Sequence, residues 1–432
     1  MATDLVRDII QDIRTPLYRN ATFLIMNTAL VAGAGFLFWF VVTHLYGEED
    51  VGQIFILIGV ATFLATLSQL GFGTGLIRFL PGTRRDRGKM INSCLTISTI
   101  VSIVLAVILL ASLDLWFPQG RGLLRFWLLV PIFLLLVPMQ VNAPIVNSTF
   151  VAGRKASFVL LKTSLFQGTR LLMPLLLVGL LGVLGILASF VFAHVIALSV
   201  SFFLLLPRLY PGFRPGPAIS GTVVNDILHF SLGNHVAEVL YALPYPVILL
   251  FISTLTGSVE QAAFFAIPWL IASMLFAIPL MTSVSLYAEG SHFEDRLHHD
   301  LIRTLRFLVP LLALGTLFLW FLGGWVLSLF GSSYAVEGTD LLRILTLSGI
   351  FVAINGVFMS VARVKKWVKA IIALMAYITT VTILLSYWFI PIFGLEGTGI
   401  AWIISHGTAS AAVVGFYLFR RRPQRLSSGK DA

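Results

Sequence analysis

Charged residues and cysteine are scarce in this sequence of 432 residues. Charged side chains make up 11% of it and hydrophobic ones 58%, and the mean hydropathy is +0.96. A soluble domain carries roughly a quarter of its residues charged, so the composition excludes that class and indicates an integral membrane protein. The single cysteine, Cys94, lies in an apolar run. It excludes an intramolecular disulfide and a cysteine-based metal cluster.

Large polar loops and catalytic motifs are also missing. The connections expected on the outer side have only about 5 to 12 residues, whereas a membrane glycosyltransferase or polymerase needs a large outer loop with catalytic side chains. The glycines of LGFGTG and LEGTG follow no strand and precede no lysine at P-loop spacing. Asp4, Asp8 and Asp12 interrupt the N-terminus, which lacks the apolar core of a signal peptide. We therefore expect no enzyme, no cofactor and no metal site.

Apolar runs dominate instead. Each has about 20 residues, enough to cross a hydrocarbon core of about 30 Å as a helix. We count twelve, which predicts an all-α integral membrane protein with twelve transmembrane helices. The runs are Asn20–His44, Val51–Leu80, Ile91–Leu113, Leu123–Phe150, Ala156–Leu180, Val183–Leu206, Asp226–Thr254, Ala262–Tyr287, Leu301–Phe330, Leu341–Val361, Ala370–Ile390 and Gly397–Phe419.

The basic residues predict the orientation. Most of the 29 lysines and arginines lie in the terminal segments and in alternate connections, while acids such as Glu48, Glu49 and Glu260 lie in the others. Loops rich in lysine and arginine stay on the cytoplasmic side, so both termini are expected in the cytoplasm. The net charge of +10 then follows from topology and requires no nucleic-acid partner.

The chain also repeats itself. Gly182, Gly185 and His194 recur 212 residues later as Gly394, Gly397 and His406. Such a parallel repeat is typical of transporters with a substrate site between two similar lobes. We expect an amphipathic segment (1–19), an N-lobe of six helices (20–207), a cytoplasmic linker (208–221), a C-lobe of six helices (222–419) and a basic tail (420–432). The linker, rich in proline and glycine, is predicted to be a solvated, flexible hinge.

Arg170 lies well inside the fifth apolar run. It follows Lys155 by 15 residues, or about 22 Å of helix, so it needs an anionic partner or an aqueous cavity. Its guanidinium suits a phosphate, and pairing with Glu238 is the alternative. Lys162, Arg303 and Arg306 lie near helix ends, where they are expected to extend to water in a structural role.

Three further groups of polar side chains lie inside apolar runs. In the seventh run, Glu238 follows Asn234 by four residues, so both share a face. Glu238 is expected to be buried and to couple transport to a proton or sodium ion, or else to be a wetted wall without that role. The fourth run carries Gln140, Asn142 and Asn147, which indicate a cavity wall or a kinked packing helix. His194 and His406 are expected to form interhelical hydrogen bonds rather than a metal pair.

Three stretches carry a family resemblance. They are LYGEEDVGQIFILIGVATFLATLSQLGFGTGLIRFLP, LFGSSYAVEGTDLLRIL and IPIFGLEGTGIAWIISH. With them the chain, from about Arg19 to Arg422, resembles the polysaccharide-biosynthesis branch of the multidrug/oligosaccharidyl-lipid/polysaccharide exporter superfamily. The resemblance implies a flippase of the prokaryotic cytoplasmic membrane that exports an isoprenoid-diphosphate-linked oligosaccharide by alternating access. Its implied partners are membrane lipids and polysaccharide polymerases or glycosyltransferases.

Within that resemblance, the polar residues take expected roles. Arg78 and Arg170 are predicted to bind the diphosphate, and Glu238 to couple transport to a proton or Na+. The predicted sugar-binding residues are Asn27, Gln69, Gln140 and Asn234. The alternative function is an ion-coupled multidrug extruder, which predicts an acidic, aromatic cavity that binds cations. The sequence has more buried arginine than buried acid, and this counts against the alternative.

Overall fold

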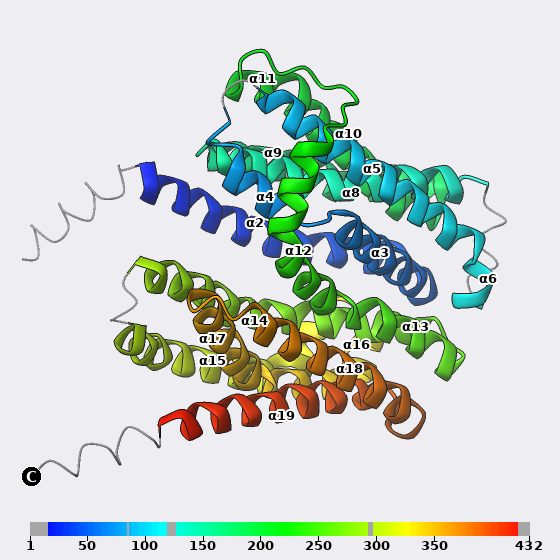
Figure 1. Ribbon diagram of the computed structural model, residues 1–432. Coiled ribbons are helices and arrows are strands. Elements are labelled where there is room, and N and C mark those ends of the chain that lie inside the picture. The colour runs from blue at the N-terminus through cyan, green and yellow to red at the C-terminus, as the bar shows by residue number, and fades with distance from the viewer. Residues whose placement is uncertain (1–15, 84–85, 119–126, 293–296, 422–432) are drawn as a thin grey trace, which may run out of the picture. The chain divides into compact units, whose positions relative to one another are not determined.

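The computed structural model describes residues 16–83, 86–118, 127–292 and 297–421, and these residues form helices joined by short turns (Figure 1). Most of segment 1–19 and of tail 420–432 lies outside the described residues. The helices are α2 (Pro16–Leu45), α3 (Glu48–Ser68), α4 (Phe72–Phe79), α5 (Arg87–Ala111), α6 (Leu113–Trp116), α8 (Leu129–Ala152), α9 (Ala156–Leu181), α10 (Leu184–Val200), a π-helical turn (Ser201–Leu205), α11 (Leu206–Leu209), α12 (Gly221–Ala242), α13 (Pro244–Thr256), α14 (Glu260–His292), α15 (Leu297–Ser328), α16 (Ser332–Leu347), α17 (Gly349–Val364), α18 (Val368–Phe393) and α19 (Glu396–Arg421).

The helices confirm the predicted all-α membrane fold. Within the described residues, eleven helices are long and apolar enough to cross a membrane, and the bent pair α16 and α17 raises the number to twelve. The tenth predicted run, Leu341–Val361, falls on two helices, α16 and α17, which meet at Ser348 with a bend of 41°. The hydroxyl of Ser348 donates to Leu345 O at 2.6 Å, a local bond that competes with helical bonding.

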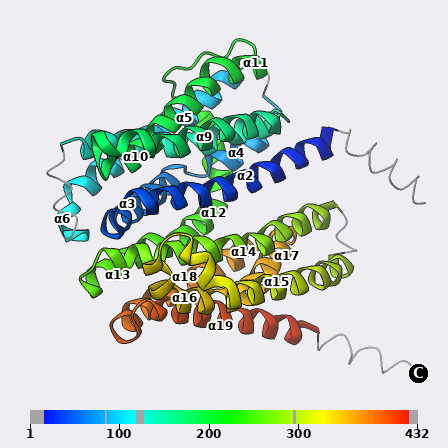
Figure 2. The same ribbon diagram turned by 180° about the vertical axis from the view of Figure 1, so that it is seen from behind.

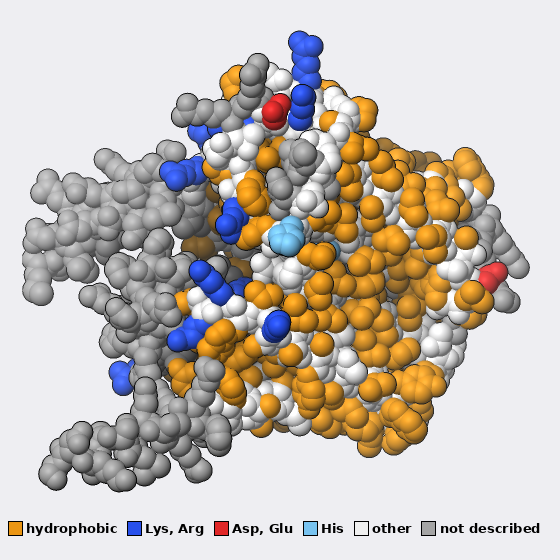
Figure 3. All heavy atoms as spheres, in the orientation of Figure 1, with side chains coloured by type: hydrophobic (Ala, Val, Ile, Leu, Met, Phe, Trp, Pro, Cys, Tyr) orange, Lys and Arg blue, Asp and Glu red, His pale blue; other side chains and the backbone are white. Residues whose placement is uncertain are grey.

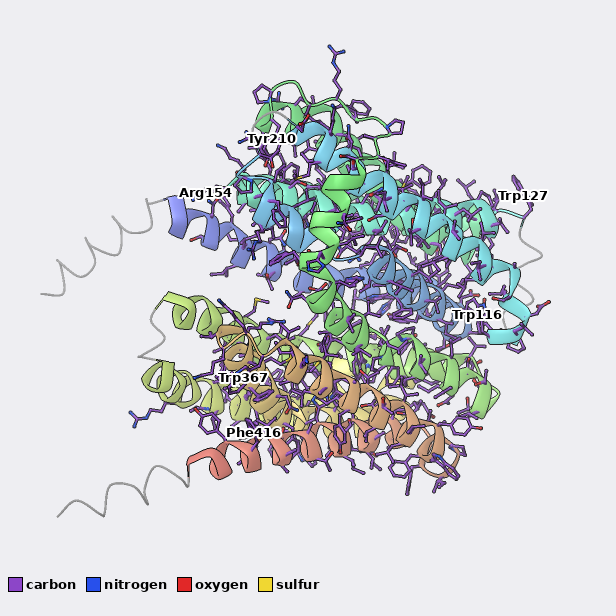
Figure 4. All side chains as sticks on the ribbon, viewed as in Figure 1. Trp116, Trp127, Arg154, Tyr210, Trp367 and Phe416 are labelled. Atoms are coloured by element: carbon purple, nitrogen blue, oxygen red, sulfur yellow. The ribbon has the colours of Figure 1, made fainter. Side chains whose placement is uncertain are left out.

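The chain forms two compact units, residues 1–239 and 240–432. Each unit presents a mostly hydrophobic surface on the face drawn in Figure 3. Most of the Lys and Arg side chains visible there gather at one end of the helices of each unit. In the N-terminal half, Arg154 and Tyr210 lie at one end of the helices, and Trp116 and Trp127 lie at the other (Figure 4). Lys and Arg at one end, with Tyr or Trp at both ends, are typical of helices that cross a membrane.

The two halves repeat each other in backbone detail. Helices α9 and α18 each have 26 residues and begin 212 positions apart. The residues two positions before the two helices match. Arg154 has φ +55° and Lys366 has φ +58°, values that residues other than glycine rarely adopt. Each sits in the same helix-ending turn, in which Lys155 N donates to Phe150 O and Trp367 N to Ala362 O. The parallel repeat predicted from the glycines therefore extends to the turns.

The boundary between the two compact units lies between residues 239 and 240. Figures 1 and 2 show the long helices of each unit lying side by side. The division falls inside α12 rather than at the predicted linker. The first part of α12 belongs to the N-terminal unit, where Ile227 is buried in a hydrophobic cluster with Phe72 and Leu76.

The linker is exposed over most of its length, as predicted for a solvated connector, but hydrogen bonds hold it against the N-terminal unit. Side chains of α5 hold its backbone: Asn92 Nδ2 donates to Arg214 O at 2.9 Å, and Ser93 Oγ accepts from Ser220 N at 3.1 Å. Tyr210 and Phe213 are both buried, and the Tyr210 hydroxyl donates to a backbone carbonyl of α8 at 3.0 Å. The prolines of the linker end helical structure. The hydrogen bonds from α5 and Tyr210 then hold the non-helical backbone in place.

Two glycines allow α12 to approach α4 closely. A Cβ atom at Gly71, whose φ is +74°, would lie 2.7 Å from Ser231 Cβ. A Cβ at Gly75 would lie 2.2 Å from Ile227 Cγ2. Both distances are far shorter than van der Waals contact, so only glycine fits at these positions.

We expect Gly75→Ala to destabilise the protein by about 1–3 kcal/mol, because the added methyl group overlaps a buried side chain. The matched control is Gly33→Ala, also in a membrane helix, where a Cβ meets nothing within 4 Å. Adding Ile227→Ala removes the clashing Cγ2 and is expected to recover part of the loss. Thermal unfolding of the detergent-solubilised chain measures the three variants. Equal melting temperatures for Gly75→Ala and Gly33→Ala would contradict this contact.

Candidate functional site

A cavity of about 380 Å³ lies inside the N-terminal unit. Helices α2, α3, α8, α9 and α10 line it, and its volume is in the range of small-molecule sites. Polar side chains are concentrated on its walls. They are Thr62, Thr66, Gln69, Gln140, Asn147, Lys162, Thr163, Gln167, Arg170 and His194.

Helix α9 supplies one wall through a single stripe of side chains. Lys162, Phe166 and Arg170 are spaced by four residues, and Thr163 and Gln167 lie beside them. This spacing places all five side chains on one face of an α-helix. The same five line the cavity, so α9 presents its polar stripe to it.

Proline shapes the wall that α8 contributes. Pro144 lies inside α8 and lacks the N–H that would bond to the carbonyl oxygen of Gln140. One residue earlier, Ala143 O accepts a hydrogen bond of 2.6 Å from Lys162 Nζ. The ammonium is thereby held between α8 and α9, and only 4% of the residue's surface is exposed.

Arg170 is enclosed by aromatic rings. Its guanidinium carbon lies 4.5 Å from the ring centre of Phe38, 5.0 Å from that of Phe190 and 5.4 Å from that of Phe166. The residue is 9% exposed, and no ion pair joins it to an acid among the described residues. Ring faces offset part of the cost of burying a cation. They leave the hydrogen-bonding fork free for an anion.

Several buried polar atoms of the cavity residues have no hydrogen-bond partner in the protein. They are Oε1 of Gln140, Oδ1 of Asn147, Oε1 of Gln167 and Nε of Arg170. Buried polar atoms are nearly always paired in folded proteins, and an unpaired one is costly. Their gathering around one cavity indicates a site for a polar ligand.

The cavity is electropositive. Lys162 and Arg170 line it, and no aspartate or glutamate is among the described residues that do. An acidic cavity, which the extruder hypothesis predicts, is therefore not found at this site. The remaining polar groups are neutral amides and hydroxyls, with His194, whose Nδ1 lies 2.8 Å from Phe190 O. Because a carbonyl oxygen only accepts, that nitrogen carries the proton.

The structure brings together three of the sequence-predicted site residues. Gln69, Gln140 and Arg170 line the cavity. Of the three amides in the fourth run, Gln140 and Asn147 line it, whereas Asn142 donates to Thr99 Oγ1 at 2.8 Å. Lys162 also lines the cavity, although its place near a helix end predicted an extension to water. Its spacing of eight residues from Arg170, on the same helical face, was the signal that could have identified it.

The other predicted residues lie elsewhere. Asn27, Arg78, Asn234 and Glu238 do not line this cavity. Arg78 is exposed and stacks on Phe230, with 4.1 Å from its guanidinium carbon to the ring centre.

Glu238 is more exposed than expected. Its side chain is 48% exposed, and its carboxylate lies 3.8 Å from Nδ1 of His235, which is too long for a hydrogen bond. His235 in turn contacts Leu67 O at 3.3 Å through Nε2. The expected burial of Glu238 is wrong, and the alternative in which it pairs with Arg170 is not found among the described residues.

The matching positions of the C-terminal unit carry no cations. The repeat places Leu374 where the first half has Lys162, and Thr382 where it has Arg170. His406, which matches His194, packs in a buried network in which Asn355 Nδ2 donates to its carbonyl oxygen at 3.1 Å. Among the described residues, no three His, Cys, Asp or Glu side chains lie close enough to hold a metal ion.

Comparison with known proteins shows the fold. No protein-family model and no curated protein sequence match the chain. Solved structures do resemble it. An inward-facing multidrug resistance MATE family transporter of the MOP superfamily has a TM-score of 0.69 at 17% identity, covering 93% of this chain and 96% of its own. An outward-facing one has a TM-score of 0.63 at 16% identity, covering 98% and 99%.

A third structure is a MOP superfamily transporter from Pyrococcus furiosus, in which reverse polarity of the binding pocket suggests a different function. It has a TM-score of 0.66 at 16% identity and covers 95% of this chain and 96% of its own. These likenesses agree with the superfamily resemblance seen in the sequence and leave its polysaccharide branch a prediction. The chain has the twelve-helix, two-lobe fold of the MATE transporters of the MOP superfamily.

Proposed function

We propose that this chain is a transporter of the MOP superfamily that exports an anionic amphipathic substrate by alternating access. The fold supports transport, because the structures that it resembles are transporters. The substrate's charge is inferred from one observation: Lys162 and Arg170 line the cavity, and no acid is among its described lining residues. Cations at membrane depth are costly and mark substrate pathways, and a guanidinium binds a phosphate by two parallel hydrogen bonds.

An isoprenoid-diphosphate-linked oligosaccharide fits these features. In this proposal the diphosphate binds Arg170 and Lys162, the sugars bind the amides of Gln69 and Gln140, and the lipid tail stays in the bilayer. Asn27, Arg78 and Asn234 contact the substrate at other stages of the cycle, and Glu238 takes up a coupling proton or sodium ion. The protein would lie in a prokaryotic cytoplasmic membrane with both termini in the cytoplasm, beside the polymerase or glycosyltransferases that use its product.

Multidrug extrusion is the second candidate, and the comparisons favour it over saccharide export. Two of the similar structures are described as multidrug resistance transporters. The cavity's charge narrows this candidate to anionic drugs, since Lys162 and Arg170 would repel cations. The neighbour from Pyrococcus furiosus, with its pocket of reverse polarity, is an example of this fold with an altered pocket charge.

Direct binding separates these functions. We expect a polyprenyl-diphosphate-linked saccharide to bind the purified chain and raise its melting temperature, and ethidium, a cationic drug, to do neither. Lys162→Gln removes one charge-assisted contact, which is worth about 1.5–3 kcal/mol. The affinity of the Lys162→Gln variant for the diphosphate ligand is therefore expected to be about 10- to 100-fold lower than that of the unchanged protein. The matched control is Lys89→Gln, because Lys89 is exposed and lies outside the cavity.

Three outcomes decide between the candidates. Binding of the saccharide ligand but not of the free polyprenol or an anionic drug supports export of a lipid-linked saccharide. Equal binding of anionic drugs, with loss in Lys162→Gln, supports extrusion of anionic drugs. Tight binding of ethidium that Lys162→Gln leaves unchanged would overturn the proposed anionic substrate.

A further inference from the structure

A second hollow lies on the C-terminal unit, in a groove between α17, α18 and α19. Its volume is about 310 Å³. Ala370, Ala373 and Tyr377 of α18 form one side, and Ala409, Ala412 and Phe416 of α19 form the other. Tyr377 follows Ala370 by seven positions, which gives the groove a length of about 10 Å along the helix. Its walls are almost wholly apolar, so it suits an alkyl chain rather than a sugar or an ion.

Small side chains create this groove, and the repeat shows which ones. The matching positions of the N-terminal unit lie 212 residues earlier. There, Phe158 corresponds to Ala370, Leu161 to Ala373 and Val200 to Ala412. The other half thus carries larger side chains at three positions where this half carries alanine. The groove is a feature of the C-terminal unit and does not follow from the shared fold.

Three lysines lie at one end of the groove. Lys365, Lys366 and Lys369 are exposed and lie in the turn from α17 to α18 and at the start of α18, directly before Ala370. Trp367 marks the same end, because its ring lies edge-on to that of Phe416 with 6.2 Å between the ring centres. Figure 4 shows both rings at this end of the C-terminal unit. Tryptophan beside lysine at a helix end is typical of the membrane interface.

We propose that this groove binds one acyl chain of an anionic phospholipid, with the lipid phosphate at Lys365, Lys366 and Lys369. The alanines admit the chain, and the lysines sit where the headgroup of a lipid so placed would lie. Lipid tails are as apolar as the groove, so burial alone gives no preference among lipids. Selectivity for anionic lipid therefore comes from the lysines, each contributing about a fivefold gain in affinity near a membrane surface. The proposal is independent of the transported substrate.

Photo-labelling tests the site in the full chain. The chain is reconstituted in phosphatidylcholine nanodiscs with a trace of diazirine-labelled phosphatidylglycerol or of a phosphatidylcholine with identical chains. We expect phosphatidylglycerol to label α18 and α19 between Ala370 and Phe416 preferentially. Changing all three lysines to glutamine is expected to lower this labelling on the order of 100-fold relative to phosphatidylcholine.

Groove-filling variants provide the second arm. Ala370→Phe, Ala373→Leu and Ala412→Val introduce the side chains of the other repeat and are expected to abolish labelling of the groove by both lipids. Ala373→Leu alone gives a milder form if the triple variant unfolds, and melting curves check each variant. Equal labelling by the two lipids, undiminished labelling after filling, or equal labelling at Phe158 and Leu161 would overturn the proposal. Displacement of phosphatidylglycerol by equimolar polyprenyl phosphate would overturn it too, by assigning the groove to a carrier lipid.

Discussion

Arg170→Met is expected to reduce transport at least 100-fold while the protein still folds and inserts. The guanidinium is held by three aromatic rings rather than by a protein carboxylate. A charge at the centre of a membrane helix costs about 2.5–3.5 kcal/mol, and each ring contact returns about 0.5–2 kcal/mol. These terms nearly cancel, so removing the charge should change stability little. Two charge-assisted hydrogen bonds to an anion, in contrast, are lost outright.

The signature to measure is ligand-dependent stabilisation. A ligand at 100 times its Kd adds about 2.7 kcal/mol to the stability of a folded protein. In Arg170→Met this gain should vanish while the melting temperature of the free protein stays the same. Arg170→Lys should be intermediate, because an ammonium keeps the charge but not the fork.

A packing role for Arg170 predicts the reverse. It would lower the melting temperature of the free protein and leave the ligand-dependent gain intact. Arg343→Met is the control, since Arg343 is partly exposed and already pairs with Asp340 at 3.0 Å. Its replacement should alter neither transport nor stabilisation by the ligand.

Local patterns in the sequence were enough to predict the helices and the repeat. Apolar runs determine where helices can cross a membrane, and glycines such as Gly182 and Gly394 mark the turns because they adopt positive φ. The depth of Arg170 also followed from counting residues along a single helix. These features depend on residues near one another in the chain, so one sequence suffices to find them.

Features that depend on contacts between distant segments were missed. Nothing in the linker's prolines shows that Asn92 and Ser93 bind its backbone. Lys162 was assigned to water because the carbonyl of Ala143, its partner, lies on another helix. The exposure of Glu238 likewise depends on neighbours rather than on its own helix.

Because the linker is hydrogen-bonded to the N-terminal unit, we expect the hinge at the end of α12 instead. On one side of this point, His235 contacts Leu67 O in the N-terminal unit. On the other, Thr379 Oγ1 donates at 2.6 Å to Leu240 O, within the C-terminal unit. Pro244 explains this second bond, because it lacks the N–H that would otherwise bond to that carbonyl. A break between two differently anchored helix segments is suited to absorb a change in backbone angles.

Pro244→Ala is therefore expected to slow transport by about 10-fold without weakening substrate binding. Alanine restores the missing helical hydrogen bond and stiffens the segment, so the conformational step becomes slower. Transport by proteoliposomes and the Kd of the detergent-solubilised chain measure the two effects separately.

The linker supplies the contrasting test. In a Cys94→Ser background, a short thiol cross-link between cysteines introduced at positions 92 and 214 should leave transport unchanged, because Asn92 already holds that backbone. A linker that acts as the hinge gives the opposite pair of results, with transport blocked by the cross-link and unaffected by Pro244→Ala. Loss of binding and transport together in Pro244→Ala would instead mean that the proline shapes the substrate site.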